Sequence, residues 1–168
     1  DAFYDCSSLT DITIPGSVTS IGKYAFYNCR KLASIEIPSS VTSIGEYAFY
    51  SCTGLISINI LEGVTSIGGS ACGYCSSLTS ITIPKSVESV GDKAFSGCPV
   101  LKEVLLENGS TLTSERLGVS ENQIGTYWNE GNLTWTLTAD GTLTISGTGA
   151  MKVYSTDDSP AYNNSNIK

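Results

Sequence analysis

Hydrophobic and polar residues alternate in short stretches along the first two thirds of the chain, and most of these stretches end at a proline. In the segment 9–22, Ile12 and Ile14 alternate with Asp11 and Thr13, which is the period of a β-strand with one buried face. Pro15 follows, and because proline has no backbone N–H to donate to a sheet, we expect the strand to end there. The pattern therefore predicts a short strand that buries its isoleucines.

The remainder of the segment predicts how the chain turns back on itself. Val18 and Ile21 are expected to point inward from a second short extended stretch. Gly22 permits a tight bend, and residues 23–28 are expected to form a helical or 3-10 turn that inserts an Ala-Phe pair. Each coil would then return to its start and stack on the next at the inter-strand spacing of about 4.8 Å.

This segment repeats with a period of 23 residues, without an insertion, over five consecutive units. Three positions are nearly constant: an alanine followed in four units by phenylalanine, a cysteine and a leucine. The alanines are Ala2, Ala25, Ala48, Ala71 and Ala94, the cysteines Cys6, Cys29, Cys52, Cys75 and Cys98, and the leucines Leu9, Leu32, Leu55, Leu78 and Leu101. One unit cannot bury its apolar side alone, so such units fold as stacked arrays. The predicted fold is a mainly β solenoid of about five 23-residue coils.

The repeat changes after Leu106. Glu115 and Arg116 fall where the coil should place Ile-Gly, and charges at an inward position predict that this coil is no longer stacked. We therefore expect a solenoid over residues 1–116 that ends or is capped near its last residue. Residues 117–130 contain several glycines and are predicted to be a connector.

A second small unit is predicted over residues 131–168. Leu133, Trp135 and Leu137 alternate with threonines, and another alternating stretch follows the turn at 139–141. Glycine at the third turn position can adopt a left-handed backbone, so we predict a β-hairpin. A lone hairpin is only marginally stable, and we expect it to pack on the connector, on the solenoid or on residues further along. The unit is expected to be incomplete or to cap the solenoid, and the polar tail at its end to be loose.

The stretch SLTSITIPKSVESVGDKAFSGC, from Ser77 to Cys98, resembles the BspA-like leucine-rich repeats of bacterial surface proteins. The resemblance covers residues 1 to about 106 and is specific because it recurs in every unit. It implies a leucine-rich-repeat solenoid in an extracellular or cell-surface protein. It also implies a non-catalytic binding module that mediates adhesion to host or neighbouring-cell proteins, or to glycans. The stretch NLTWTLTADGTLTISGTGAM resembles segments found between repeat blocks in such proteins.

Composition and charge narrow the functional classes. The net charge is −7 and the lysines and arginines are scattered, so nucleic acid is not expected as a partner. The chain has no histidine, the commonest general base and metal ligand, and we expect neither catalysis nor a cofactor. No apolar run is long enough to predict membrane insertion. Because Asp1 is not an initiator methionine and no signal peptide is recognisable, we expect the chain to be part of a longer protein.

The five periodic cysteines are expected to be free thiols that fill space in the core. Stacked neighbours would hold their Cβ atoms about as far apart as the strands, which is longer than the roughly 3.5–4.5 Å found in a disulfide. Cys72 and Cys75 form a C-x-x-C motif, which elsewhere serves redox or zinc chemistry. Cys72 occupies the phenylalanine position of the repeat, so the space-filling interpretation is favoured over metal or redox use.

Two surfaces carry candidate binding residues. The first consists of tyrosines at two repeat positions, Tyr4, Tyr27 and Tyr50 at one and Tyr24 and Tyr47 at the other. Because their Ala-Phe neighbours point inward, the tyrosines are expected on the outer surface, where such rings suit protein or glycan partners. The alternative is that they only cover the turns of adjacent coils.

The second surface consists of the polar positions of the strands, which would line the concave sheet where solenoids commonly bind. These residues are Asp11, Ser34, Ser57, Ser80 and Glu103 in one row and Thr13, Glu36, Asn59 and Thr82 in the other. Small hydroxyl groups predominate and neither Trp nor Arg occurs among them, so an ordinary solvated sheet surface is the favoured interpretation.

The leading hypothesis from the sequence is therefore an adhesive binding module. One rival is a structural spacer that holds another domain away from the cell wall. The other is a carbohydrate-binding module, for which the tyrosines and Trp135 are the hints.

Overall fold

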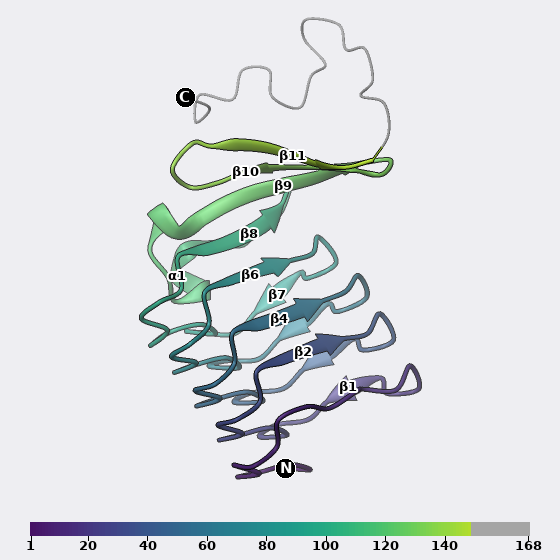
Figure 1. Cartoon of the computed structure of the whole chain (residues 1–168), viewed down its shortest axis with the longest axis vertical. Helices are drawn as coiled ribbons and strands as arrows, with labels where there is room; N and C mark the ends of the chain where they lie inside the picture. The colour runs from purple at the N-terminus through teal and green to yellow at the C-terminus, as the bar shows by residue number, and fades with distance from the viewer. Residues whose placement is uncertain (149–168) are drawn as a thin grey trace, which may run out of the picture.

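The computed structural model of the chain describes residues 1–148 and shows a solenoid whose coils stack along one long axis (Figure 1). The coils contribute strands to two sheets. The narrower sheet consists of β1 (Ser20–Ile21), β3 (Ser43–Ile44), β5 (Ser66–Ile67) and β7 (Ser89–Val90). The wider sheet has the order β11-β10-β9-β8-β6-β4-β2, and its solenoid strands are β2 (Ser34–Ile37), β4 (Ser57–Ile60), β6 (Ser80–Ile83) and β8 (Glu103–Glu107).

Neighbouring coils pair in parallel and in register, so each residue lies beside its counterpart in the next unit. In the wider sheet Ile35 lies opposite Ile58, and in the narrower sheet Ile44 lies opposite Ile67. The inward positions form one continuous core of buried apolar side chains that extends through all coils. The predicted solenoid is therefore confirmed.

The turn at residues 23–28 is only in part the helical or 3-10 turn that we expected: Ala25 and Tyr27 donate to carbonyls three residues back, but no continuous helix forms. The backbone N–H of Phe26 donates to the carbonyl of Ala48 in the next coil at 2.7 Å, and alternate amides of the turn do the same. Tyr24 and Asn28 have φ values of 57° and 62°. A helix requires right-handed φ at every residue, so these left-handed positions replace it with a ladder between coils.

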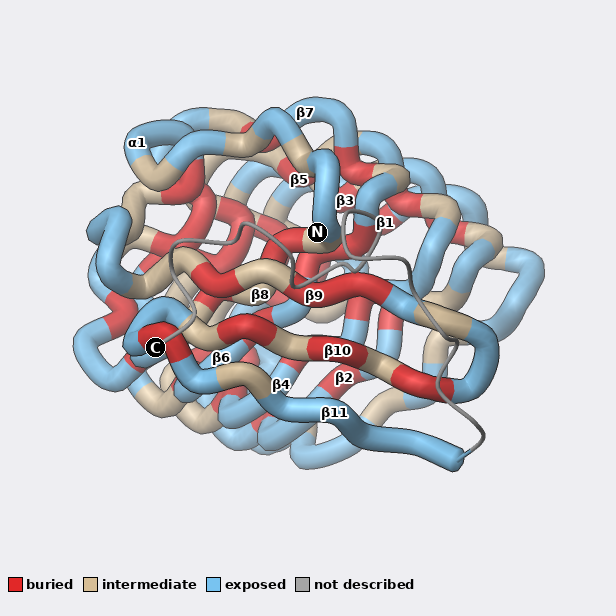
Figure 2. Tube along the Cα trace, turned by 90° about the horizontal axis from the view of Figure 1, so that it is seen from above, coloured by how far each residue is buried: buried red, intermediate tan, exposed pale blue. Residues whose placement is uncertain are grey.

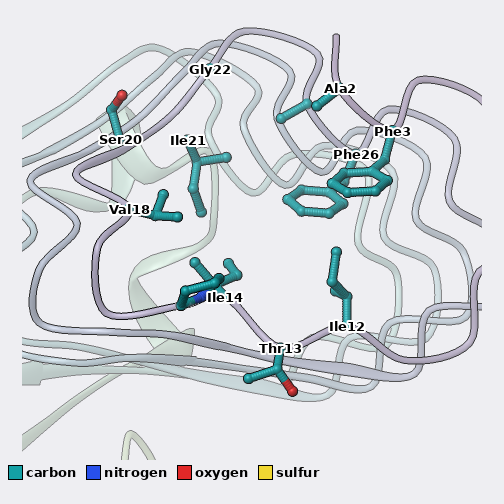
Figure 3. A pocket seen from close by; sticks show the side chains of 12 residues that line it. Ala2, Phe3, Ile12, Thr13, Ile14, Val18, Ser20, Ile21, Gly22 and Phe26 are labelled. Carbon is teal, nitrogen blue, oxygen red and sulfur yellow. The ribbon is translucent and has the colours of Figure 1, made fainter.

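The first coil lacks the strand predicted around Ile12 and Ile14, and its residues 11–14 form no ladder. This coil has a neighbour on one side only, and its inward side chains are half-buried where their counterparts in the next coils are buried. They line a hollow of about 300 Å³ at the open end of the stack, together with Phe3 and Val18 (Figure 3). The sequence pattern is that of a strand, but in this coil residues 11–14 form no ladder with β2.

The coil that contains Glu115 and Arg116 remains stacked, contrary to the expectation from these charged residues. Glu115 and Arg116 are exposed within the short helix α1 (Ser114–Leu117), and Leu117 at its end is fully buried. The carbonyl of Leu117 accepts a hydrogen bond of 2.9 Å from the backbone N–H of Phe95. The helix therefore turns both charges outward while a leucine continues the core.

The predicted connector contains a strand that the sequence analysis missed. After the 3-10 helix η1 (Glu121–Gln123), β9 (Ile124–Glu130) pairs in parallel with β8 and antiparallel with β10 (Leu133–Leu137). The predicted hairpin is confirmed, since β10 pairs with β11 (Leu143–Gly147) and Gly141 has a φ of 89°.

The strand β9 attaches this hairpin to the solenoid, so the sheet changes from parallel to antiparallel as it covers the end of the stack (Figure 1). Seen from that end, buried residues lie along β9 and β10, while β11 is an exposed edge (Figure 2). The indole rings of Trp128 and Trp135 stack there with centroids 5.9 Å apart. The polar tail predicted to be loose lies outside the described residues.

Candidate functional site

The tyrosines at the two repeat positions form two columns on the outside of the turns. In the first column, the ring of Tyr27 lies 4.9 Å from that of Tyr4 and 5.4 Å from that of Tyr50, with interplanar angles of 4° and 5°. In the second column, Tyr24 and Tyr47 stack at 5.3 Å and 10°. The columns contact each other edge to face, as Tyr24 does against Tyr27 at 73°.

A sixth tyrosine extends the first column and was not predicted. The ring of Tyr74 lies 5.3 Å from that of Tyr50, at an angle of 52°, and Tyr74 is 56% exposed. Its repeat position differs by one residue, because Gly73 occupies the tyrosine position and leaves room for the neighbouring ring. The signal in the sequence that could have predicted this ring is a glycine at the tyrosine position followed directly by a tyrosine. We call the set Tyr4, Tyr24, Tyr27, Tyr47, Tyr50 and Tyr74 the tyrosine surface.

Stacking determines which parts of these rings a ligand can reach. The faces of the inner rings are covered by their neighbours, so the tyrosine surface presents ring edges and phenol hydroxyls. None of the six hydroxyls makes a hydrogen bond to another group within residues 1–148. Burial, and then the neighbouring tyrosines, raise the pKa of Tyr50. The hydroxyl therefore stays protonated at neutral pH and can both donate and accept.

The polar rows of the strands lie where the sequence predicted, on the outward side of the wider sheet. All of these residues are exposed except Glu103, which is partly buried. Asn59 donates a hydrogen bond of 3.0 Å to Glu36 across neighbouring coils. Burial, and then the charge of Asp140 in the hairpin turn, raise the pKa of Glu103. The rows thus form a continuous polar surface without an aromatic residue.

Six copies of the family described as "BspA type Leucine rich repeat region" match residues 1–116. The chain belongs to this family. Among solved structures, the T. pallidum leucine rich repeat protein is 34% identical, with a TM-score of 0.62 over 70% of this chain and 57% of that protein. A leucine-rich repeat protein from Bacteroides ovatus is 35% identical, with a TM-score of 0.55 over 63% of this chain and 35% of that protein.

A leucine rich cell surface protein from Faecalibacterium prausnitzii is 32% identical over 65% of this chain and 34% of its own length, with a TM-score of 0.47. No curated protein is significantly similar. The BspA-type chain thus spans between about a third and just over half of the length of these proteins. It is a repeat module, consistent with a binding or scaffold role. No helix within residues 1–148 is long and apolar enough to cross a membrane.

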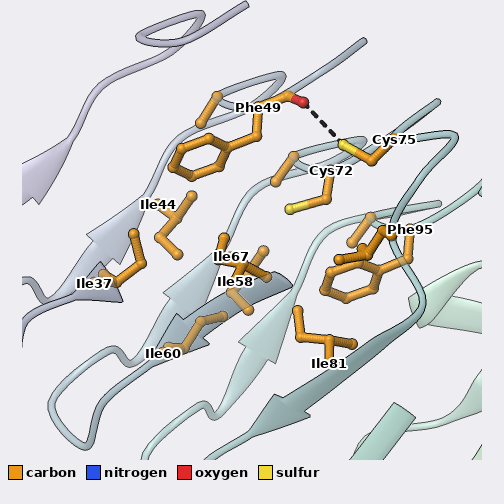
Figure 4. Close-up of a cluster of buried hydrophobic side chains, with 14 of the residues drawn as sticks. Ile37, Ile44, Phe49, Ile58, Ile60, Ile67, Cys72, Cys75, Ile81 and Phe95 are labelled. Carbon is orange, nitrogen blue, oxygen red and sulfur yellow. Dashed lines mark hydrogen bonds between the residues drawn. The ribbon is translucent and has the colours of Figure 1, made fainter. Parts of the chain in front are cut away.

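The cysteines of the BspA-type coils are inward-facing thiols with one exception. Cys6, in the open first coil, is exposed, whereas we predicted all periodic cysteines to be buried. The thiol of Cys52 donates to the carbonyl of Phe26 at 3.0 Å, and that of Cys75 donates to Phe49 at 3.1 Å (Figure 4). The buried thiols therefore fill space and also bond one coil to another.

Burial also makes these thiols hard to ionise. It raises the pKa of Cys29 to about 11 and that of Cys52 to about 12. Cys72, which takes the phenylalanine position, is buried in the core between coils (Figure 4), and burial raises its pKa well above the ordinary value. All cysteines of the chain are free, and within residues 1–148 no group of three or more metal-ligating side chains comes together.

Proposed function

We propose that this chain is a non-catalytic binding module of a secreted or cell-surface bacterial protein, where it mediates adhesion to host or neighbouring cells. The observation that carries this proposal is the tyrosine surface, a set of six contacting rings with unused hydroxyls. Tyrosine offers a large contact area at a low cost in conformational entropy. Stacking lowers that cost further, because the rings are already ordered before a partner arrives.

The polar rows are a weaker candidate for the binding site. Their side chains are small or charged and lack the aromatic and arginine anchors that dominate binding energy. A structural spacer is the alternative function, since the uninterrupted ladder between coils also suits a rigid rod. The spacer predicts that the tyrosines can be replaced without consequence for any interaction.

A binding screen with matched variants tests the proposal. The purified chain is applied to immobilised matrix proteins, mucins and a glycan array, beside a triple variant in which Tyr4, Tyr27 and Tyr50 are replaced by Ser. A double variant on the polar rows, Ser57→Ala with Thr82→Ala, is the control. We expect saturable binding that falls at least tenfold in the tyrosine variant and is unchanged in the control, with the circular dichroism of all three proteins alike.

Two outcomes would contradict this proposal. Binding that survives in the tyrosine variant and falls in the control would move the site to the wider sheet. Binding to none of the immobilised partners would favour the spacer.

A further inference from the structure

The spacing of the first tyrosine column restricts which ligand can contact several rings at once. Successive centroids from Tyr4 through Tyr27 and Tyr50 to Tyr74 are 4.9, 5.4 and 5.3 Å apart. Nearly parallel rings at one repeat position carry their hydroxyls at the same step. An extended peptide presents side chains on one face every ~6.6 Å and falls out of step with the column. A polyproline II helix, which repeats every ~9 Å, does so as well.

A linear β-1,4-linked hexose chain advances by close to the column's step with each sugar, and it carries hydroxyls along both edges. We propose that the tyrosine surface binds a neutral linear glycan laid along the stacking axis, with one sugar for each ring of the first column. This inference rests on the proposed function and names the ligand class of the same site.

The rings of the column divide the contacts between them. Tyr27 and Tyr50 have neighbours on both faces, so they offer hydroxyls that donate to and accept from sugar hydroxyls. The column ends, Tyr4 and Tyr74, are 53% and 56% exposed. Tyr74 is also tilted by 52° from its neighbour, which opens ring surface for the C–H face of a sugar. Hydrogen bonding in the middle and stacking at the ends together fix the ligand along four rings.

Electrostatics select a neutral glycan over a charged one. The chain carries a net charge of −7. The cation that lies over the tyrosine surface is Lys23, whose Nζ is 5.2 Å from the ring centroid of Tyr24. It is paired with Glu46 at 2.6 Å, and this hydrogen bond is the main cause of the raised pKa of Lys23. Within residues 1–148 no other cation is found over these rings, so nothing there offsets the repulsion that a uronic acid or sulfated chain would meet.

Calorimetric titration with defined oligosaccharides tests this inference. The probes are β-1,4-linked oligomers of glucose and of N-acetylglucosamine with two to six sugars, and an oligogalacturonate as the charged comparison. We expect affinity to rise with each sugar up to four and then to level off, and the charged oligomer not to bind. Replacing Tyr27 and Tyr50 by Phe keeps the stacking and removes two hydroxyls, which should weaken binding on the order of tenfold.

The control variant is Thr82→Val, because the polar rows repeat at a similar step but have no aromatic ring. It should bind like the unmodified chain. The glycan inference would be overturned if neither neutral series binds, or if affinity does not depend on the number of sugars. It would also be overturned if binding is lost in the Thr82→Val control and not in the Phe variant. If a protein from the screen binds through the tyrosines while no oligosaccharide does, the inference fails and the proposed adhesive function stands.

Discussion

The phenylalanine column in the core allows a quantitative test of how the coils stabilise one another. Phe26 stacks on Phe3 and on Phe49 with both centroid distances at 5.1 Å. Phe49 is fully buried, whereas Phe3 lies at the open end and is partly exposed. Replacing Phe49 by Ala should cost about 3–5 kcal/mol, the range for a buried phenylalanine. Replacing Phe3 by Ala should cost less than half as much, because Phe3 is partly exposed and less buried area is lost, while each variant loses one ring contact, with Phe26.

The two tryptophans provide the assay. Both Trp residues of the chain, Trp128 and Trp135, lie in β9 and β10, so their fluorescence reports the capped end, while far-UV circular dichroism reports every coil. In a solenoid each coil contacts only its neighbours. The Phe49→Ala change should therefore split urea unfolding into two steps, of which the first is seen by circular dichroism and not by tryptophan.

The Phe3→Ala variant should keep the tryptophan midpoint of the unmodified chain. The reasoning is refuted if Phe3→Ala destabilises the protein as much as Phe49→Ala. It is equally refuted if the two signals still coincide in the Phe49→Ala variant with an unchanged midpoint.

The thiols and glycines give further tests. The exposed Cys6 should react with iodoacetamide at once at pH 8, whereas the buried Cys52 should react only after unfolding. The pKa of Cys52 is about 12, which makes its thiolate about 1,000-fold rarer than at the ordinary pKa of 9.0. Mass spectrometry of the labelled protein distinguishes the two thiols. Because the pKa of Cys52 is raised in the folded state, its thiol form favours folding, and this contribution to the free energy of unfolding should be complete below pH 9 and decline as the pH rises from 9 to 12. Urea unfolding at pH 8 and at pH 11 measures the difference. Gly63→Ala should lower stability by about 1–3 kcal/mol, since its φ is 130° and a Cβ would lie 2.1 Å from the carbonyl oxygen of Ser39. Gly16→Ala, where a Cβ meets nothing within 4 Å, is the control, and its thermal midpoint should not fall.

The regular part of the fold was predictable because periodicity reports burial directly. The alternation that predicts a strand is the same in every unit, and it is correct for Ile35 and Ile37, whose strand β2 pairs with β4. It fails for Ile12 and Ile14, which form no ladder with β2, because the pattern within one unit does not reveal whether a stretch pairs with its neighbour.

The turn and the last strand were harder to predict for local reasons. A left-handed φ is uncommon at a tyrosine such as Tyr24. The residue type therefore did not predict the ladder that takes the place of a helix. Asp5 and Asn28, at the other left-handed position, are of the types that tolerate this conformation and were the available signal. In β9 the adjacent Tyr127 and Trp128 are both buried, which breaks the alternation of a half-buried strand. Five tyrosines of the candidate site followed from periodicity, and whether they bind a partner stays a prediction.

The ladder between coils has a mechanical consequence. The coils stack along one axis (Figure 1), and the hydrogen bonds that join one coil to the next, such as that from Phe26 to Ala48, therefore run along it. A load applied between Asp1 and β11 therefore pulls these bonds apart a few at a time, instead of shearing them together as in strands pulled lengthwise. Each coil that opens releases 23 residues, or about 75 Å of chain. Under tension we therefore expect such a module, rigid at rest, to lengthen coil by coil.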